Sequence, residues 1–278
     1  MPPEPALPAA LGRVALVGAG PGPADLMTVR ALRAVEGAQA LLYDALVGAE
    51  ILDLAPQGCL RIQTGKRAGR TSMKQETINR LMLRLARRGL RVVRLKGGDP
   101  SIFGRVGEES AFLRAHGVPV EIVPGVTAAC AAAAQFDFPL THRGLARRVV
   151  FTTATLSSGA LNPDWDAAAD PEATLAIYMG GAAADAVRQR LVAAGRPATT
   201  PVLAVENAGG PGARLAKGTL AHLVELTMSQ HGGPVLIVVG AVAALADVEA
   251  RDRTTARKAS REQEETPQIN QAAVRWWR

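Results

Sequence analysis

Cysteine, histidine and aromatic residues are scarce in this chain of 278 residues, and each scarcity excludes a class of protein. The two cysteines, Cys59 and Cys130, are isolated from each other and from other metal-ligand residues, which excludes a disulfide framework and a zinc cluster. With only four scattered histidines, we expect no metal site. Aromatic residues make up 4% of the chain, so alanine, valine and leucine must build the core, as in tightly packed α/β proteins.

Long hydrophobic runs are also absent, since no window approaches the roughly eighteen apolar residues that span a membrane. The first residues lack the basic start and apolar run of a signal peptide, so we expect a cytoplasmic protein. The formal net charge of +7 suits either nucleic acid or a polyanionic small molecule as a partner. The few aromatic residues disfavour nucleic acid, because single strands are bound largely by stacking on aromatic rings.

Short apolar runs alternate with helical patterns along the first half of the chain, which predicts a mostly parallel sheet covered by helices. Strands are expected in "VALVGAG", "ALLYDALV", "CLRIQTGK", "RVVRLKGGDP" and "VEIVPGV". One helix is expected to begin at an Asp25 cap and to close at Gly37, and another to follow a capping box of Ser72 and Gln75. Further helices are expected around residues 111–115 and over the alanine-rich residues 127–134, which end this unit.

A second α/β unit follows a boundary in "PLTHRGLARR". It has five expected strands, in "RRVVFTT", "ATLAIYMGG", "TTPVLAVENAG", "ARLAKGTL" and "GPVLIVVG", with helices near residues 183–193 and 221–228. We therefore divide the chain into a flexible lead (1–12), an N-terminal domain (13–145), a C-terminal domain (146–248) and a charged, partly disordered tail (249–278).

The glycine-rich stretch "VGAGPGP" at the end of the first strand is the first candidate binding loop. A dinucleotide-binding fingerprint needs a third glycine where this chain has Pro23. Pro21 and Pro23 also lack the N–H groups that would bind a pyrophosphate. The sequence therefore disfavours a nicotinamide cofactor and favours a rigid turn that brings a ligand close to the backbone.

Two further motifs follow expected strands, where the ligand crevice of a parallel sheet lies. In "KGGDP", Gly97 and Gly98 let a ligand approach the main chain, and Asp99 places a carboxylate beside it. In "VPGVTAACAAAA", Thr127 offers a hydroxyl at the start of a helix of small residues, although plain helix packing explains that stretch equally well.

Basic residues are spread over the same loops, and guanidinium groups pair well with carboxylates. Each basic run alone would more often be a solvated face, so the functional reading depends on their convergence at strand ends. The residues concerned are Lys66, Arg67, Arg70, Arg105, His142 and Arg143.

Eight motifs in order, "VGAGPG", "YDALV", "GKRAG", "VVRLKGGDPSIFGR", "VPGVTAA", "PLTHR", "YMG" and "VEN", resemble the uroporphyrinogen-III C-methyltransferases of the tetrapyrrole methylase superfamily. The resemblance covers about residues 13–248. It implies two αβα domains with the active site in the cleft between them, and a homodimer. Three departures stand out: Val106 and Ala208 replace usual glycines, and "FTTATLSSG" lacks a usual Gly-His pair.

The resemblance implies S-adenosylmethionine as methyl donor, leaving as S-adenosylhomocysteine, and no metal. It implies two successive methyl transfers to uroporphyrinogen III, through precorrin-1 to precorrin-2, on the way to sirohaem, cobalamin or haem d1. The implied donor-binding residues are Pro21, Gly97, Gly98, Asp99, Ile102, Thr127, Ala128, Met179 and Ala208.

The resemblance also implies acid–base and substrate-binding roles. Asp44 and Lys66 match a proton acceptor and a proton donor, while Arg105, Glu108 and Arg143 match positions for substrate binding or deprotonation. We expect Arg67, Arg70 and His142 to assist in binding the polycarboxylate substrate. The residues alone do not choose the base among Asp44, Glu108 and an unusually held arginine, or decide whether Lys66 donates a proton or binds a carboxylate. Two alternatives stay open: another precorrin methyltransferase of the superfamily, and a basic nucleic-acid-binding protein.

Overall fold

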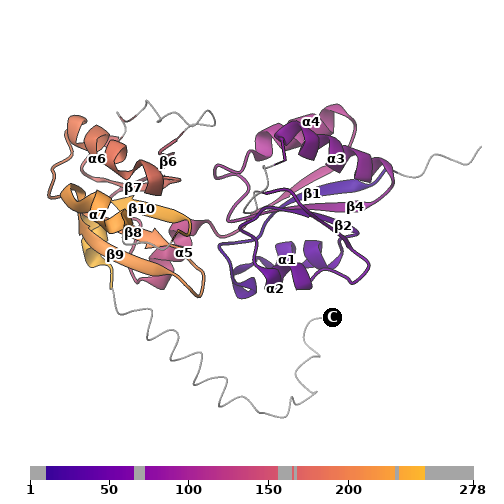
Figure 1. The fold of residues 1–278 in the computed structure, drawn as a ribbon, viewed down its shortest axis with the longest axis horizontal. Helices are drawn as coiled ribbons and strands as arrows, with labels where there is room; N and C mark the ends of the chain where they lie inside the picture. The colour runs from indigo at the N-terminus through magenta and orange to yellow at the C-terminus, as the bar shows by residue number, and fades with distance from the viewer. Residues whose placement is uncertain (1–10, 66–72, 156–164, 166–167, 229–231, 248–278) are drawn as a thin grey trace, which may run out of the picture.

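The computed structural model describes residues 11–65, 73–155, 165, 168–228 and 232–247. The chain forms two α/β bodies side by side, each built on one five-stranded sheet (Figure 1). This confirms the predicted α/β class with two sheet-centred units. Within the described residues, no helix combines the length and apolar character needed to cross a membrane.

The first sheet is entirely parallel, with strand order β3-β2-β4-β1-β5. Its strands are β1 (Arg13–Gly18), β2 (Ala40–Tyr43), β3 (Leu60–Gln63), β4 (Arg91–Lys96) and β5 (Val120–Val123). Helices α1 (Val29–Glu36) and α2 (Ala49–Asp53) cover one face, and α3 (Gln75–Arg87) and α4 (Val106–Ala115) cover the other (Figure 1).

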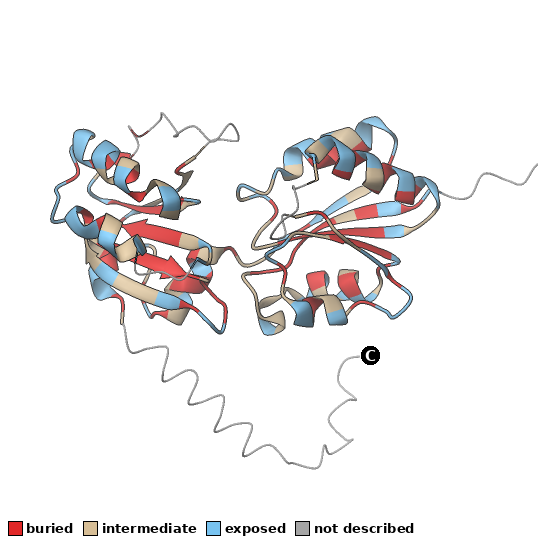
Figure 2. Ribbon diagram, viewed as in Figure 1, coloured by how far each residue is buried: buried red, intermediate tan, exposed pale blue. Residues whose placement is uncertain are grey.

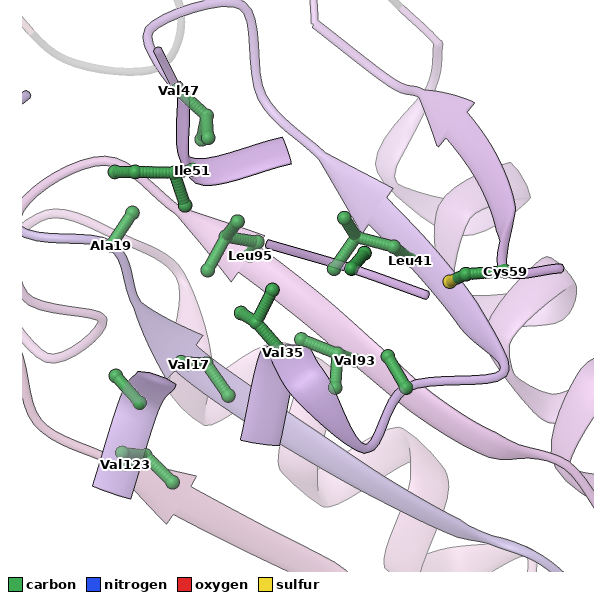
Figure 3. Packing of buried hydrophobic residues seen from close by; sticks show 13 residues of the cluster. Val17, Ala19, Val35, Leu41, Val47, Ile51, Cys59, Val93, Leu95 and Val123 are labelled. Atoms are coloured by element: carbon green, nitrogen blue, oxygen red, sulfur yellow. The ribbon is translucent and has the colours of Figure 1, made fainter. Parts of the chain in front are cut away.

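Alternating side chains on each strand feed the two faces, as the pleat of a strand requires. On β1, Val14 and Leu16 pack with α3 and α4, while Val17 packs with α1 and α2. Figure 3 shows the α1–α2 side, where Val35 and Ile51 meet the strand residues. Buried residues run along the strands of both bodies, with exposed residues on the outer helix faces (Figure 2).

The second sheet has the order β6-β7-β10-β8-β9, and only β6 and β7 are parallel. Its strands are β6 (Arg148–Thr153), β7 (Ala173–Tyr178), β8 (Pro201–Glu206), β9 (Arg214–Thr219) and β10 (Val235–Val239). Helices α6 (Ala184–Ala193) and α7 (Leu223–Met228) pack on one face of it. Short 3₁₀ turns complete the described chain, at Ala24–Leu26, Gly181–Ala183, Leu220–His222 and Ala241–Leu245.

The alanine-rich helix α5 (Ala128–Gln135) belongs to the second sheet, which corrects the prediction that it ends the first unit. Ala129, Ala132 and Phe136 lie in one apolar cluster with Leu203 and Val238. Small side chains let this helix lie close to the sheet, which explains its composition. The described chain therefore passes from the first sheet to the second at Pro124–Thr127, ahead of the predicted boundary (Figure 1).

Two predicted helix starts are wrong. Asp25 lies in the 3₁₀ turn Ala24–Leu26, and Thr28 caps α1 instead, because its extended backbone lets Oγ1 accept the amide of Ala31 at 3.2 Å. Helix α3 begins at Gln75 itself, one position after the N-cap Lys74 and not three after a Ser72 cap, and the Gln75 side chain donates to Asn79. Ser72, the other half of the predicted capping box, lies outside the described residues.

Candidate active site

A cavity of about 990 Å³ lies where the two bodies meet, at the carboxyl ends of strands from both sheets. Residues that directly follow β2, β4 and β7 line it, namely Asp44, Gly97 and Met179. Asn207, which follows β8, and Thr127 at the start of α5 complete the ring. Its size lies at the upper end of the range of pockets for small molecules.

The predicted glycine-rich turns lie side by side on the cavity wall and are hydrogen-bonded to each other. The amide of Gly98 donates to the carbonyl of Gly20 at 2.7 Å, and the amide of Gly20 donates back at 3.2 Å. Both residues have positive φ, of +69° and +73°, which glycine adopts freely. A Cβ at Gly97 would lie 3.3 Å from Leu46 Cβ, so a larger residue there would press on another part of the cavity wall.

Asp99 connects this turn to the crossing between the sheets. Its Oδ2 accepts the amide of Gly125 at 2.9 Å, and its Oδ1 accepts the amide of Ser101 at 2.8 Å and also the Ser101 hydroxyl. A carboxylate with several donors holds its surroundings firmly. Asp99 therefore lines the cavity and also fixes two of its walls.

The opposite wall is organised by Tyr178 at the end of β7. Its hydroxyl lies 2.6 Å from Thr127 Oγ1 and accepts the amide of Ala129 at 3.2 Å, so it fixes the start of α5. Burial raises the pKa of Tyr178, and the Thr127 hydrogen bond opposes this. The ring of Phe103, from the first body, packs against Tyr178 with centroids 5.2 Å apart.

Four non-glycine residues on the cavity wall have left-handed backbone conformations: Phe103, Arg105, Met179 and Asn207, with φ between 51° and 58°. Such conformations cost free energy and persist only where the surroundings impose them. Among the described residues outside the cavity lining, Asp137 alone shares this feature. The clustering marks the cavity as a functional site.

A buried charged network lies beneath the first-domain side of the cavity. Glu109 of α4 is fully buried and accepts hydrogen bonds from Arg94 Nε at 3.2 Å and from Lys96 Nζ at 3.1 Å. Gln75 donates to the same Oε1 at 2.9 Å. Arg94 also bonds Asp44 at the cavity surface, with 2.5 Å between its terminal nitrogen and Oδ1.

Lys96 is almost completely buried in this network and reaches the cavity wall. Its burial is the main cause of a lowered pKa, and the neighbouring Arg94 charge adds to it, whereas Glu109 and Asp44 act in the opposite direction. Two acids and two bases therefore balance one another, with Arg94, Lys96 and Glu109 buried and Asp44 at the cavity surface.

The cavity brings together most of the residues that the sequence proposed. Those that line it are Pro21, Asp44, Gly97, Gly98, Asp99, Ile102, Arg105, Thr127, Ala128, Met179 and Ala208. Lys66, Arg67 and Arg70 lie outside the described residues, so their predicted roles stay predictions.

Three proposed residues lie away from the cavity lining. His142 and Arg143 are exposed on the short turn that ends at Ala146, where His142 Nδ1 contacts the carbonyl of Arg143. Glu108 is exposed on the first turn of α4 and pairs with Arg105 at 2.7 Å, and this hydrogen bond lowers the pKa of Glu108. Two carboxylates thus line the cavity, those of Asp44 and Asp99. Both Asp99 oxygens already accept hydrogen bonds within the protein, and Glu108 contacts the cavity through Arg105.

Sequence reasoning missed Arg94, Lys96, Glu109, Gln75 and Tyr178 as site residues. One signal was available, because Arg94 and Lys96 lie two residues apart on a strand and share the face of Val92, which is buried. Charged residues on a buried strand face need partners, and such pairs often mark a site.

Comparisons with known proteins agree with this geometry. The model of the family Tetrapyrrole (Corrin/Porphyrin) Methylases matches residues 13–224. A siroheme synthase of Tolumonas auensis is 48% identical over 236 residues, which are 85% of this chain and 50% of that protein. One of Chromobacterium violaceum is also 48% identical, over 85% of this chain and 50% of its own length. The chain thus spans about half the length of the curated relatives it matches.

Solved structures give the same result. The uroporphyrin-III C-methyl transferase of Thermus thermophilus, complexed with S-adenosyl homocysteine, aligns with a TM-score of 0.74 at 42% identity. That alignment covers 84% of this chain and all of the other. A cobalt precorrin-4 methyltransferase aligns with the same TM-score at 30% identity, over 83% of this chain and 95% of the other. From the family match, the relatives and the fold together, the chain belongs to the tetrapyrrole methylases.

Proposed function

We propose that this protein transfers methyl groups from S-adenosylmethionine to ring carbons of uroporphyrinogen III. The observation that carries the proposal is the cavity between the two sheets, where the glycine turns, the Thr127 wall and the Asp44 carboxylate meet. The relatives named siroheme synthase and the Thermus structure with its bound S-adenosyl homocysteine support it.

The residues at the cavity fit such a donor. Gly97 and Gly98 present main chain without a side chain to the cavity, while Thr127, Ala128, Met179 and Ala208 also line it. When bound, the donor supplies a methyl group activated by a sulfonium charge. The protein's own task is to hold that methyl in line with the substrate carbon in a cavity poor in water, which lowers the barrier by positioning.

Proton removal from the substrate is the remaining chemical step. The substrate carbon forms a bond to the methyl carbon while the sulfur–carbon bond breaks, and a proton must then leave the ring. Asp44 is the carboxylate on the cavity wall that is placed to take it, with the C–H electron pair returning to the ring system. Arg105 lies on the same wall and would pair with a substrate carboxylate.

The proposal also covers the number of methyl groups transferred, the assembly and the pathway that uses the product. We propose two successive methylations, by way of precorrin-1 to precorrin-2, and a homodimer as the working assembly. Sirohaem is the favoured pathway, because the relatives carry that name. His142, Arg143 and the basic residues at 66–70 would bind substrate carboxylates at the rim.

Incubation with uroporphyrinogen III and S-adenosylmethionine, followed by mass measurement of the product, tests the proposal. We expect a product with two added methyl groups, and none with Asp44→Asn. Intact binding of S-adenosylhomocysteine without any methyl gain would redirect the proposal to another precorrin, a substrate class represented among the structural relatives.

A further inference from the structure

Arg94, Lys96 and Glu109 form a charged network that is almost completely buried beside the cavity. The side chains of Arg94, Lys96 and Glu109 are 3%, 6% and 0% exposed. Burying ion pairs is costly, and well-packed apolar residues of similar volume often give equal or greater stability. Val92, on the same face of β4 but farther from the cavity, shows that this face accepts an apolar residue.

Every nitrogen of the Arg94 guanidinium makes a separate hydrogen bond. Nε donates to Glu109 at 3.2 Å, one terminal nitrogen donates to the carbonyl of Leu95 at 3.3 Å, and the other donates to Asp44 at 2.5 Å. The planar guanidinium is therefore fixed in orientation, with its fork aimed at the cavity surface.

Asp44 is held from one side only. Its Oδ1 accepts hydrogen bonds from Arg94 and from Thr64 Oγ1, the latter at 3.3 Å, whereas Oδ2 has no hydrogen-bond partner among the described residues. The side chain is 32% exposed and lies on the cavity wall. One oxygen is anchored, and the other is left available to accept a proton.

We propose that Arg94 is a positioning residue of the methyl-transfer reaction: anchored by buried Glu109, it orients the Asp44 carboxylate so that Oδ2 faces the substrate. The inference rests on the proposed function, in which Asp44 accepts the proton. The ring C–H bond breaks, the O–H bond forms at Oδ2, and the electron pair stays with the ring. Lys96 pairs with Glu109 as a second cation, and the Thr64 hydroxyl donates a second hydrogen bond to Asp44 Oδ1.

The test is the double variant R94M/E109Q. Removing one buried base and one buried acid together keeps the buried charge balanced, so the variant should fold where Arg94→Met alone would leave Glu109 with reduced pairing. The matched control is R80M/E76Q, which makes the same replacement in an exposed pair of α3 that lies 2.6 Å apart. A second variant, Thr64→Val, removes the longer hydrogen bond to Asp44 Oδ1.

We expect R94M/E109Q to lower kcat by about 100-fold, the scale on which small misplacements of a reacting group act. KM and the Kd for S-adenosylhomocysteine should stay within about threefold, since a lost transition-state contact acts on kcat. Thr64→Val should have a smaller effect of the same kind, and R80M/E76Q none. A kcat for R94M/E109Q within about threefold of the parent, with binding unchanged, overturns the inference.

A crystal structure of R94M/E109Q with S-adenosylhomocysteine separates this inference from the proposed function. If the parent protein does not methylate uroporphyrinogen III, the proposed substrate is rejected. The position of the Asp44 carboxylate in the crystal structure of the variant then tests the role of Arg94. An Asp44 carboxylate rotated away from the parent position supports Arg94 as its positioning residue. An Asp44 carboxylate in the parent position rejects that role, whatever the substrate.

Discussion

At the scale of single residues, glycine serves two separate purposes around the cavity. Gly97 lines the cavity next to the Leu46 side chain, whereas Gly18 and Gly125 allow two backbone segments to touch. A Cβ at Gly18 would lie 2.6 Å from the Gly125 nitrogen, and one at Gly125 would lie 2.3 Å from the carbonyl oxygen of Gly98. The glycine-rich motifs therefore combine binding and packing, which the sequence pattern alone does not separate.

Asp99→Ala is expected to weaken S-adenosylhomocysteine binding by about tenfold, or ~1.4 kcal/mol. The change removes the acceptor of the Gly125 and Ser101 amides, so the two walls that it joins lose their fixed spacing. Titration calorimetry measures the affinity, with Asp185→Ala on α6 as a control that should bind normally. An unchanged Kd in Asp99→Ala would show that the turn keeps its shape without the carboxylate.

Tyr178 predicts a dependence of stability on alkaline pH. Burial raises its pKa above the ordinary value of 10.0, so the folded state holds the phenol proton more tightly than the unfolded state. This contribution to the free energy of unfolding is complete below about pH 10 and is lost as pH rises through the folded-state pKa. Urea unfolding of the parent and of Tyr178→Phe measures it.

We expect the parent to lose its advantage over Tyr178→Phe as pH rises above about 10. A constant difference between the two proteins across that range would contradict the assignment.

At the scale of elements, the sequence located the strands better than the helix starts. All ten described strands fall where apolar runs predicted them, and only β1 begins earlier, by one residue, because a buried strand needs a continuous or alternating apolar run. Helix starts depend on single polar contacts: Thr28 and Asp25 are both good caps, and only the backbone conformation distinguishes them. The sheet on which α5 packs could not be predicted, because hydrophobic periodicity shows that a helix is buried but not which sheet covers it.

The same distinction applies to the site. Loop residues such as Gly97 and Asp99 could be placed from motifs, because strand ends gather at one edge of a sheet. Arg94 and Glu109 could not be paired from sequence, since their contact depends on how α4 lies across β4.

Thr28→Ala should destabilise the protein by about 1 kcal/mol, because the amide of Ala31 loses its capping oxygen. The Thr28 hydroxyl also donates to the carbonyl of Pro124 at 3.2 Å, so the variant loses a second contact. Urea unfolding should show Thr28→Ser close to the parent, since serine keeps the oxygen. Equal loss in both variants would indicate that the methyl group matters and the cap does not.

At the scale of the whole molecule, one close contact between the two bodies joins Gly209 to Pro21. A Cβ at Gly209 would lie 2.4 Å from Pro21 Cγ, and the backbone there has φ of +84°. Gln135 of α5 holds the same loop, by accepting the Gly209 amide and donating to the carbonyl of Gly210. The proline that argues against a dinucleotide site thus also forms part of the contact between the bodies.

Gly209→Ala and Gly195→Ala form a matched pair that measures this contact. Both glycines have positive φ, but a Cβ at Gly195 would meet nothing within 4 Å. Gly195→Ala should cost about 1–2 kcal/mol for the backbone alone, and Gly209→Ala about 1–3 kcal/mol more for the overlap with Pro21. Urea unfolding measures both, and equal losses would show that the two bodies separate freely at this point.

The segment Pro124–Thr127, which joins the two sheets, also forms part of the cavity wall. This segment joins one sheet to the other, and its end, Thr127, lines the cavity while Gly125 is held by Asp99. Any change in the angle between the sheets must bend the chain there and so reshape the ligand's own wall. A ligand that touches Thr127 would contact this joining segment directly, so occupancy of the cavity and the angle between the sheets would be coupled.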